Sequence, residues 1–161
     1  MTAHELLVDV ATQYLYHFKD GKLAKKYLVS TAKKGLGEEI GSEKTPQGWH
    51  IVRAKIGAEQ PINTVFIARR PTGEIYSTEL DLTYPNRDWI LTRILWLSGL
   101  EVDKNRFGNC DTMKRYIYIH GSPDNKAMGV PGSKGCINMT NRDILELFAE
   151  IPTRTKILIK G

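Results

Sequence analysis

The sequence predicts a mostly β fold that contains one short helix. Most of the chain consists of short runs of β-branched and aromatic residues separated by Gly, Pro and Asp, a pattern typical of strands joined by turns. One stretch near the C-terminal end instead repeats apolar residues at helical spacing. Because the chain has 161 residues and is 41% hydrophobic, we expect residues 1–161 to form a single domain with a well-buried core.

In the first third of the chain the pattern predicts strands, a hairpin turn and a long loop. Strands are expected over residues 5–10, 13–18 and 23–30. The last two are joined at Asp20-Gly21, because both residue types tolerate the positive φ of a tight turn. No other metal-ligating residue lies at a suitable spacing from His17. This favours a strand histidine that is hydrogen-bonded within the protein or faces solvent over a metal ligand. Residues 33–48 are rich in Gly, Lys and Glu and predict a loop, and long ordered loops tend to carry function.

Further strands are expected in the middle of the chain. The β-branched and aromatic runs lie at residues 51–56, 64–68 and 74–78, with breaks at Pro61 and Pro71-Thr72-Gly73. The apolar stretch 88–97 fits both a buried strand and a helix, so periodicity alone leaves it open. Its Arg93 stands out, because a buried arginine is rare unless it is paired.

A helix and a final strand are expected near the C-terminal end. Thr140 and Asp143 form a capping box at the start of the helix, and Pro152 closes it. The apolar face of this helix consists of Ile144, Leu145, Leu147, Phe148 and Ile151. The last strand is expected over residues 155–160.

Two segments before this helix suggest thiol chemistry. Residues 115–119 alternate aromatic and aliphatic side chains and predict a strand that ends at His120. Cys136 follows sixteen positions later, in a glycine-bearing loop that is expected to run into the helix. A thiol nucleophile and its base require such a pair. Taken alone, Cys136 could equally be a small residue buried for packing. His120 taken alone could be a histidine at a strand end that is hydrogen-bonded within the protein.

These segments resemble the catalytic motif of the L,D-transpeptidase family (YkuD-like), whose members have a His-Gly pair ending one strand and then a Ser-His-Gly-Cys block. The corresponding segments here are Tyr118-Ile119-His120-Gly121-Ser122 and Ser133-Lys134-Gly135-Cys136-Ile137-Asn138. Further matching landmarks lie at residues 6–10, 20–21, 29–33, 45–50 and 91–97. The resemblance implies an L,D-transpeptidase-like β-sandwich with a short helix after the catalytic cysteine loop, and makes residues 91–97 a buried strand near the cleft.

The resemblance also implies a role for each residue of the motif. Cys136 is the expected nucleophile and His120 its general base and acid, since a thiol attacks a carbonyl only as thiolate. The backbone carbonyl of Gly121 or Ser122 is expected to orient the His120 ring, as the aspartate does in a catalytic triad. The backbone N–H of Gly135 is expected to stabilise the oxyanion, aided by the start of the following helix.

Six further residues are candidates for substrate binding. They are Ser133, Lys134, Asn138, Arg93, Arg115 and His50. Lys134 stands where the family usually has histidine, and Asn138 where many members have arginine, so the acceptor preference is open. Lys134 either supplies a positive field that favours a thiolate or a substrate carboxylate, or is a solvated lysine. Arg93 and Arg115 bind a substrate carboxylate or belong to structural ion pairs, and His50 contacts substrate or packs in a strand.

The resemblance implies a peptidoglycan stem peptide or muropeptide as substrate, and no metal or cofactor. The leading hypothesis is an L,D-carboxypeptidase of peptidoglycan recycling, which releases terminal D-Ala from the L-centre of the diamino acid with water as acceptor. The first alternative is an L,D-transpeptidase that forms crosslinks or exchanges D-amino acids in the cell wall. The second is a catalytically silent peptidoglycan-binding module, and acylation by a carbapenem separates an enzyme from such a binder.

Charge and hydropathy narrow the partners and the compartment. The chain has 23 basic and 18 acidic residues and a formal charge of +5, but the basic residues are scattered, which indicates a solvated surface and no nucleic-acid partner. No apolar run reaches the roughly 18 residues of a membrane span. The start of the chain lacks the pattern of a signal peptide. We therefore expect a cytoplasmic protein, with the periplasm or cell envelope as the alternative if a leader was removed.

Overall fold

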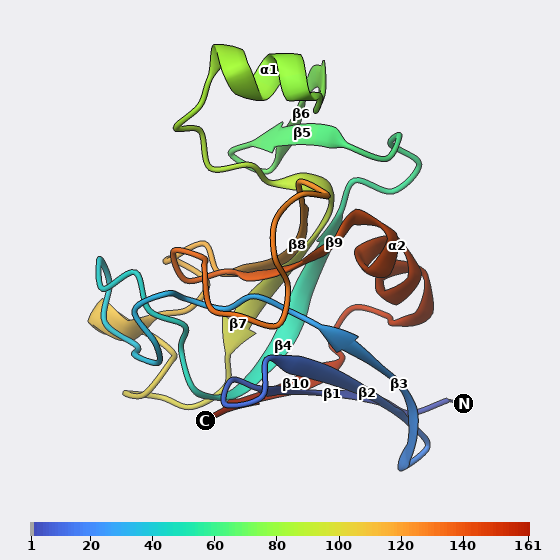
Figure 1. Ribbon diagram of the computed structural model, residues 1–161. Coiled ribbons are helices and arrows are strands. Elements are labelled where there is room, and N and C mark those ends of the chain that lie inside the picture. The colour runs from blue at the N-terminus through green and yellow to red at the C-terminus, as the bar shows by residue number, and fades with distance from the viewer. Residues whose placement is uncertain (1) are drawn as a thin grey trace.

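The computed structural model describes residues 2–161 and has a mostly β fold (Figure 1), as the sequence predicts. The strands are β1 (His4–Asp9), β2 (Tyr14–Lys19), β3 (Lys22–Leu28), β4 (Gly48–Ile56), β5 (Thr64–Ile67), β6 (Arg70–Ile75), β7 (Leu91–Gly99), β8 (Tyr118–Ser122), β9 (Ile137–Thr140) and β10 (Lys156–Lys160). The helices are α1 (Thr78–Thr83) and α2 (Asn141–Glu150), and a short 3-10 turn lies at Gly108–Cys110. In this described part of the chain, neither α1 nor α2 is long and apolar enough to cross a membrane.

The ten strands described in residues 2–161 join one strongly curled sheet. Its order is β3-β2-β1-β10-β4-β7-β5-β6, and β8 pairs with both β7 and β9. In Figure 1, β4 runs from the layer of β1, β2 and β10 up to the layer of β7, β8 and β9. The two facing layers of the predicted β-sandwich are therefore parts of one continuous sheet.

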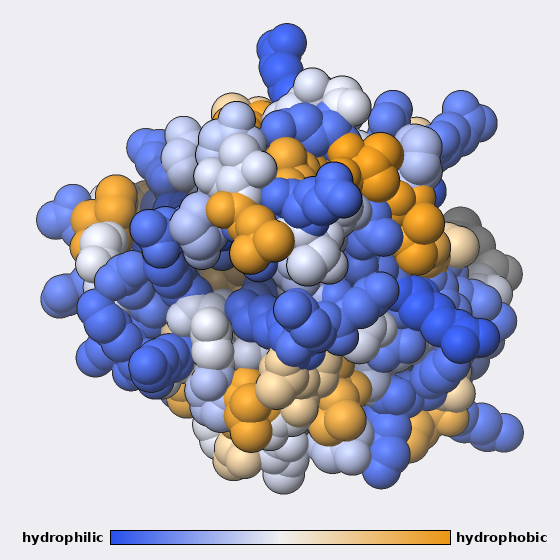
Figure 2. Space-filling model, turned by 45° about the horizontal axis from the view of Figure 1, so that its top comes forward, coloured by the Kyte–Doolittle hydropathy of each residue, from blue (hydrophilic) through white to orange (hydrophobic). Residues whose placement is uncertain are grey.

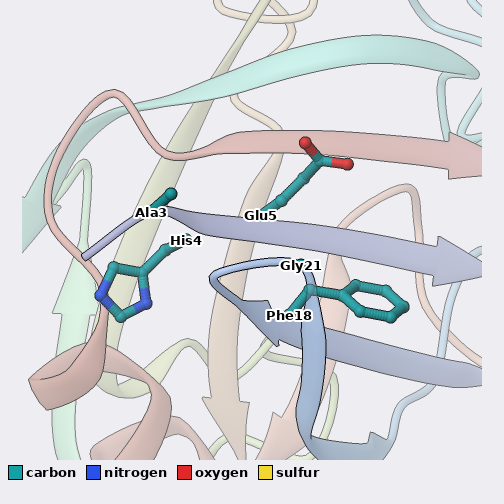
Figure 3. Close-up of a pocket in the computed structure, with 5 residues that line it drawn as sticks. All are labelled: Ala3, His4, Glu5, Phe18 and Gly21. Carbon is teal, nitrogen blue, oxygen red and sulfur yellow. The ribbon is translucent and has the colours of Figure 1, made fainter.

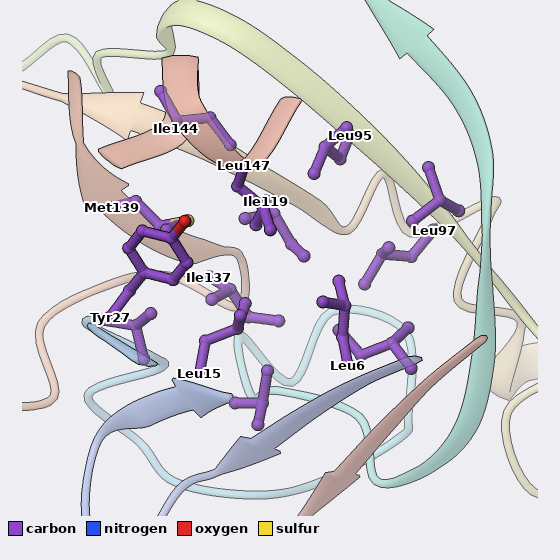
Figure 4. Packing of buried hydrophobic residues seen from close by; sticks show 14 of the residues in the cluster. Leu6, Leu15, Tyr27, Leu95, Leu97, Ile119, Ile137, Met139, Ile144 and Leu147 are labelled. Atoms are coloured by element: carbon purple, nitrogen blue, oxygen red, sulfur yellow. The ribbon is translucent and has the colours of Figure 1, made fainter. Parts of the chain in front are cut away.

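The main hydrophobic core fills the space between these two layers (Figure 4). Alternate residues of a strand point to the same face, so Leu6 and Val8 of β1 and Ile157 and Ile159 of β10 all point inward and are at most 1% exposed. Leu147 of α2 packs against the same cluster from the opposite side. Each such side chain contributes roughly 1.5–3 kcal/mol through burial, which holds the curled sheet closed.

The helix predicted near the C-terminal end is present as α2. Its N-cap is Thr140, whose hydroxyl accepts a hydrogen bond from the backbone N–H of Asp143 at 3.1 Å. Ile144 and Leu147 are fully buried, and the helix ends before Pro152. Because Thr140 is also the last residue of β9, this cap fixes the helix directly to the strand that follows the cysteine.

The segment after β5 differs from the prediction. The turn between β5 and β6 lies at Ala68-Arg69, where both residues have positive φ (49° and 64°), and Pro71-Thr72-Gly73 lies inside β6. The strand predicted over residues 74–78 is wrong beyond residue 75, because α1 begins at residue 78. A local cap explains the helix, since the Ser77 hydroxyl accepts from the N–H of Leu80 at 3.1 Å.

Residues 64–83, here called the arm, project from the body of the sheet at the top of Figure 1. A small second core joins the arm to the rest of the chain: Val65 of the arm packs with Trp89 and Leu91, which follow it. Trp89 Nε1 also donates to Asp81 Oδ1 of the arm at 2.8 Å. Figure 2, in which the top of Figure 1 comes forward, shows mostly hydrophilic residues around separate hydrophobic patches. The arm is therefore a surface element that is anchored at its base.

The structure decides the conformation of two stretches near the site. Residues 91–97 lie in strand β7, because β4 and β8 pair with it on either side. Residues 33–48 lack regular strands and helices up to the start of β4, as predicted for a loop. Within this loop, an isolated β-bridge pairs Leu36 with Thr45.

His50 is an interior residue of β4. Its side chain is fully buried, its Nδ1 donates to the Gly48 carbonyl at 2.9 Å, and its Nε2 lies 2.9 Å from the Thr112 hydroxyl. Burial lowers the pKa of His50 to about 4. Because both ring nitrogens are used inside the protein, the structure does not bring His50 to a substrate, and the packing alternative describes its position.

We predict that acid destabilises the protein through His50. The pKa of His50 is about 4 in the folded state and about 6.5 in an unfolded chain. The unfolded chain therefore binds the proton more readily, and stability falls as the pH drops from about 6.5 to about 4. The expected loss is about 3 kcal/mol in the free energy of unfolding, measured by urea denaturation at several pH values.

The control is His50→Gln, which removes the titrating group. This variant should be less stable than wild type at pH 7 but should show a flatter pH dependence below 6.5. His17, whose pKa is also lowered by burial and by His4, accounts for a residual slope. An unchanged slope in His50→Gln contradicts the assignment to His50.

Candidate active site

Strands β8 and β9 bring His120 and Cys136 to one pocket. The two strands are parallel, and His120 lies opposite Asn138 in the register. Cys136 directly precedes β9 and is two residues from Asn138, so its side chain is directed to the same face. The pocket has a volume of about 30 Å³ and is lined by Asp88, His120, Ser133, Lys134, Cys136 and Asn138. A cavity needs about 10–15 Å³ to hold a water. The pocket therefore has room for one or two water-sized groups.

The environment of His120 defines its tautomer. Its Nδ1 lies 2.6 Å from the backbone oxygen of Gly121, and because a carbonyl only accepts hydrogen bonds, Nδ1 carries the proton. The neutral ring therefore has an unprotonated Nε2. Burial lowers the pKa of His120, opposed by the Gly121 hydrogen bond and by Asp88. Of the two predicted carbonyls, Nδ1 therefore uses that of Gly121. The Ser122 hydroxyl separately donates to the carbonyl of Met139 at 2.8 Å.

His120 lies in the middle of β8, which corrects the predicted strand. The expected strand over residues 115–119 ended at His120, whereas β8 runs from Tyr118 to Ser122. The ladder continues because Gly121 pairs with Leu91 of β7 on one side and with Met139 of β9 on the other. Pairing on both sides holds the backbone of His120 more firmly than a strand end would.

Cys136 is held as a thiol in the free protein. Its side chain is half-buried, and its Sγ accepts a hydrogen bond from the backbone N–H of Tyr118 at 3.3 Å. Burial raises the pKa of Cys136 to about 12; the Tyr118 hydrogen bond lowers it, Asp88 raises it, and Arg115 and Lys126 lower it. A thiolate therefore requires that a nearby base remove the proton.

The loop before Cys136 is fastened by side-chain hydrogen bonds. Thr45 is fully buried; its hydroxyl donates to the Gly135 carbonyl at 2.9 Å and accepts from the N–H of Ala32 at 3.0 Å. The Ser133 hydroxyl accepts from the N–H of Gly135 at 3.2 Å and donates to the Cys136 carbonyl. The predicted oxyanion donor, the N–H of Gly135, is thus engaged by Ser133.

The expected short helix follows the cysteine loop, but a strand lies between the two. Strand β9 follows the cysteine, and α2 starts at Asn141, five residues further on. The contribution of a helix start to the oxyanion site stays a prediction. The pairing of β9 with β8 takes precedence, because it places apolar Ile137 and Met139 in the main core.

The structure separates the six predicted substrate-binding residues into two groups. Ser133, Lys134 and Asn138 line the pocket with Cys136. Arg93, Arg115 and His50 do not line it. Lys134 is exposed, whereas Asn138 is 2% exposed, and its Oδ1 has no hydrogen-bond partner within residues 2–161.

Both arginines bind backbone carbonyls of the protein itself. Arg93 donates to the carbonyls of Gln60 and Thr92 at 2.8 and 2.6 Å. Arg115 donates to the carbonyls of Gly37 and Lys44 at 3.2 and 2.6 Å, and thereby holds the loop of residues 33–48. Arg115 still influences the site, since its positive charge lowers the pKa of Cys136.

Sequence reasoning did not single out Asp88 or Lys126 as site residues, and it placed Thr45 only within the matching landmark of residues 45–50. Lys126 lies in the glycine-rich segment between the two motif blocks, and this position was a usable signal. Asp88 reaches the pocket from the segment after the arm, and Thr45 from the long loop. Thr45 belongs to the landmark of residues 45–50 and Asp88 opens the apolar stretch 88–97. Which of their side chains reaches the cysteine loop or its pocket depends on the fold.

A larger hollow of about 270 Å³ lies at the start of β1 and the end of β2 (Figure 3). Its lining residues are Ala3, His4, Glu5, Phe18 and Gly21. Nδ1 of His4 lies 2.8 Å from Nε2 of His17 there, on the neighbouring strand. No cysteine lines this hollow, and no cluster of three His, Cys, Asp or Glu suited to a metal occurs in the described residues 2–161. The pocket at Cys136 is the better candidate site.

Comparisons with known proteins agree with the motif. The family model described as L,D-transpeptidase catalytic domain, YkuD, matches residues 3–159. A Bacillus licheniformis protein assigned to L,D-transpeptidase YkuD is 41% identical over 46 residues, which cover 29% of this chain and 28% of that protein. The chain thus matches well under a third of this relative's length.

Solved structures share the fold at low sequence identity. An L,D-transpeptidase from Mycobacterium smegmatis superposes with a TM-score of 0.61 at 15% identity, covering 99% of this chain and 59% of that chain. L,D-transpeptidase 3 from Mycobacterium tuberculosis, solved with a faropenem-derived adduct, gives 0.61 at 13% identity, covering 99% and 61%. This chain therefore corresponds to somewhat more than half of each of these two solved proteins.

We predict that Thr45→Val destabilises the cysteine loop. The substitution keeps the size of the side chain but leaves the N–H of Ala32 and the carbonyl of Gly135 without their partner. A buried group left unsatisfied costs about 1–3 kcal/mol, so the free energy of unfolding in urea should fall by about that amount. Thr45→Ser keeps the hydroxyl and is the matched control. Equal stability of Thr45→Val and wild type contradicts the role given to this hydroxyl.

Proposed function

Because the chain belongs to the family of L,D-transpeptidase catalytic domains, we propose that Cys136 forms an acyl-enzyme with a peptidoglycan stem peptide and that His120 is its general base. One observation carries this proposal. His120 and Cys136 line the same small pocket, and the Gly121 carbonyl holds the His120 proton on Nδ1, so that Nε2 is the unprotonated nitrogen.

The proposed reaction begins with proton transfer from the Cys136 Sγ to His120 Nε2. Sγ attacks the carbonyl carbon of the L-centre of the diamino acid and forms a tetrahedral intermediate. The C–N bond to terminal D-Ala then breaks, and the imidazolium returns its proton to the leaving amine. The thioester that forms on Cys136 is resolved when His120 deprotonates an incoming water, which adds to the carbonyl, and Sγ leaves as the thiol.

The oxyanion needs a donor that the free loop does not already use. The N–H of Gly135 is bonded to Ser133 in the free protein. Either substrate binding releases it from Ser133, or the N–H of Cys136 itself takes the role. Backbone donors in this position stabilise the developing charge in a water-poor site.

The acceptor that we propose is water, which makes the protein an L,D-carboxypeptidase that releases D-Ala from tetrapeptides. The pocket of about 30 Å³ admits a water. It also adjoins a hollow of about 230 Å³ that shares Ser133 and Lys134, where the larger part of an amine acceptor fits, so the turnover experiment decides between the two acceptors. The family also supports a second candidate, an L,D-transpeptidase that uses an amine to form crosslinks or exchange D-amino acids. A cytoplasmic role in peptidoglycan recycling stays a prediction.

A non-catalytic binding module is the third candidate. The raised pKa of Cys136, about 12, favours it, because very little thiolate forms at neutral pH. An enzyme overcomes this through His120, which removes the proton within the attacking complex. Reactivity of Cys136 toward an acylating agent therefore separates the two.

We predict turnover of a tetrapeptide. Mass spectrometry of a muropeptide tetrapeptide incubated with the protein should show loss of D-Ala and accumulation of the tripeptide, with or without an added D-amino acid. Cys136→Ala should abolish the product, and His120→Gln should reduce its rate by at least about a hundredfold. A new tetrapeptide that carries the added D-amino acid identifies a transpeptidase. Absence of both products contradicts the catalytic proposal.

We also predict covalent acylation of Cys136 by β-lactams of the penem and carbapenem classes. The faropenem-derived adduct on the Mycobacterium tuberculosis relative supports this choice of probe. Intact-protein mass spectrometry should show one added β-lactam mass on wild type. Cys110→Ala should retain the adduct and Cys136→Ala should lose it. An adduct that persists in Cys136→Ala places the reactive group elsewhere.

A further inference from the structure

We infer that Asp88 binds the side-chain ammonium of the diamino acid in the donor peptide and thereby selects peptides in which this amine is free. The inference rests on the proposed function, because it names a feature of the substrate of that same site. Asp88 precedes β7 and is the acidic residue that lines the pocket with His120 and Cys136.

The carboxylate of Asp88 is available to a ligand. The residue is exposed at the mouth of the pocket and takes part in none of the ion pairs within residues 2–161. Because the pocket itself has a volume of about 30 Å³, the larger part of a peptide lies outside it, where Asp88 is placed. An unpaired carboxylate at this position attracts a positively charged group of the peptide.

The position of Asp88 is defined by its two neighbours. The Arg87 guanidinium pairs with Glu74 at 2.8 Å and lies 4.8 Å from the centre of the Trp89 ring. Trp89 is 8% exposed and donates to Asp81 at 2.8 Å. The residues on both sides of Asp88 are therefore anchored to the arm or its base, and the backbone that carries the carboxylate is held over the pocket.

The negative charge of Asp88 acts on three neighbouring groups, because it raises the pKa of Cys136, of His120 and of Lys126. Asp88 raises the pKa of Cys136, which opposes formation of the nucleophile. A bound ammonium neutralises the charge of Asp88, so the pKa of Cys136 is no longer raised by Asp88 while the substrate is bound. The other charges near Cys136 are those of Arg115 and Lys126, both positive. Arg115 is bonded to loop carbonyls, and Lys126 is close enough to Asp88 for its pKa to be raised, although the two form no ion pair within residues 2–161.

The ammonium belongs to the donor peptide and not to an attacking amine. An amine attacks a thioester only in its unprotonated form, and a neighbouring carboxylate stabilises the protonated form. Asp88 would therefore slow an acceptor that it held. A side-chain ammonium of the diamino acid does not react and stays charged throughout, so it is the group that Asp88 can bind without this penalty.

The test compares two tetrapeptides that differ at the side-chain amine of the diamino acid, free in one and acetylated in the other. For wild type, kcat/KM should be roughly tenfold or more higher with the free amine, the effect of one charge-assisted hydrogen bond. In Asp88→Asn this ratio should fall close to one, mainly through a higher KM for the free peptide. Glu79→Gln, an equal change of charge on α1 outside the pocket, should keep the wild-type ratio.

Three results overturn the inference. The first is a wild-type ratio close to one. The second is an unchanged ratio in Asp88→Asn. The third is an equal loss on both peptides together with a shifted pH profile of Cys136 alkylation, which makes Asp88 a residue that acts only through the thiol. Urea denaturation of Asp88→Asn verifies that the variant is folded.

A failure of the proposed function is recognised separately. If wild type turns over neither peptide, calorimetric binding of both peptides to Cys136→Ala decides the inference. Tighter binding of the free amine, lost in the double variant with Asp88→Asn, supports Asp88 as the ammonium site of a binding module. Equal binding of the two peptides overturns it.

Discussion

The candidate site depends above all on the parallel pairing of β8 with β9. This pairing sets His120 opposite Asn138 and thus places Cys136, two residues earlier, on the face to which the histidine belongs. The same ladder buries Ile119 and Ile137 in the core between the two layers of the curled sheet. Packing energy and site geometry therefore depend on one register, because a slip by one residue would turn both the apolar and the reactive side chains to the opposite face.

The second constraint is that burial disfavours the charged thiolate form of Cys136. Burial raises the pKa of Cys136 to about 12 and lowers that of His120, so burial favours the neutral thiol and the neutral imidazole. This arrangement avoids two buried charges in the absence of substrate. In the reaction that we propose, the thiolate therefore forms in the complex with substrate, where His120 takes the proton and substrate charges change the electrostatic field around Sγ.

Segments far from the motif complete the pocket. The loop of residues 33–48 holds the Gly135 carbonyl through Thr45, and Arg115 in turn holds this loop by its carbonyls. The base of the arm presents Asp88 at the mouth of the pocket. The long loop therefore serves as a support for the cysteine, while the segment behind the arm adds a charge that the motif itself lacks.

The sequence by itself determined the features that rest on local chemistry. Positive-φ residues at Asp20-Gly21 indicate the hairpin, the Thr140 cap indicates α2, and the alternation of apolar residues indicates the strands. The motif blocks around His120 and Cys136 indicate the family, because reactive residue types at a given spacing can be recognised in the sequence before the fold is known. Only the tertiary structure decided that His50 and Arg115 are occupied internally and that Asp88 reaches the pocket. These outcomes depend on which distant segments pair and in what register, and that information is spread over the whole chain.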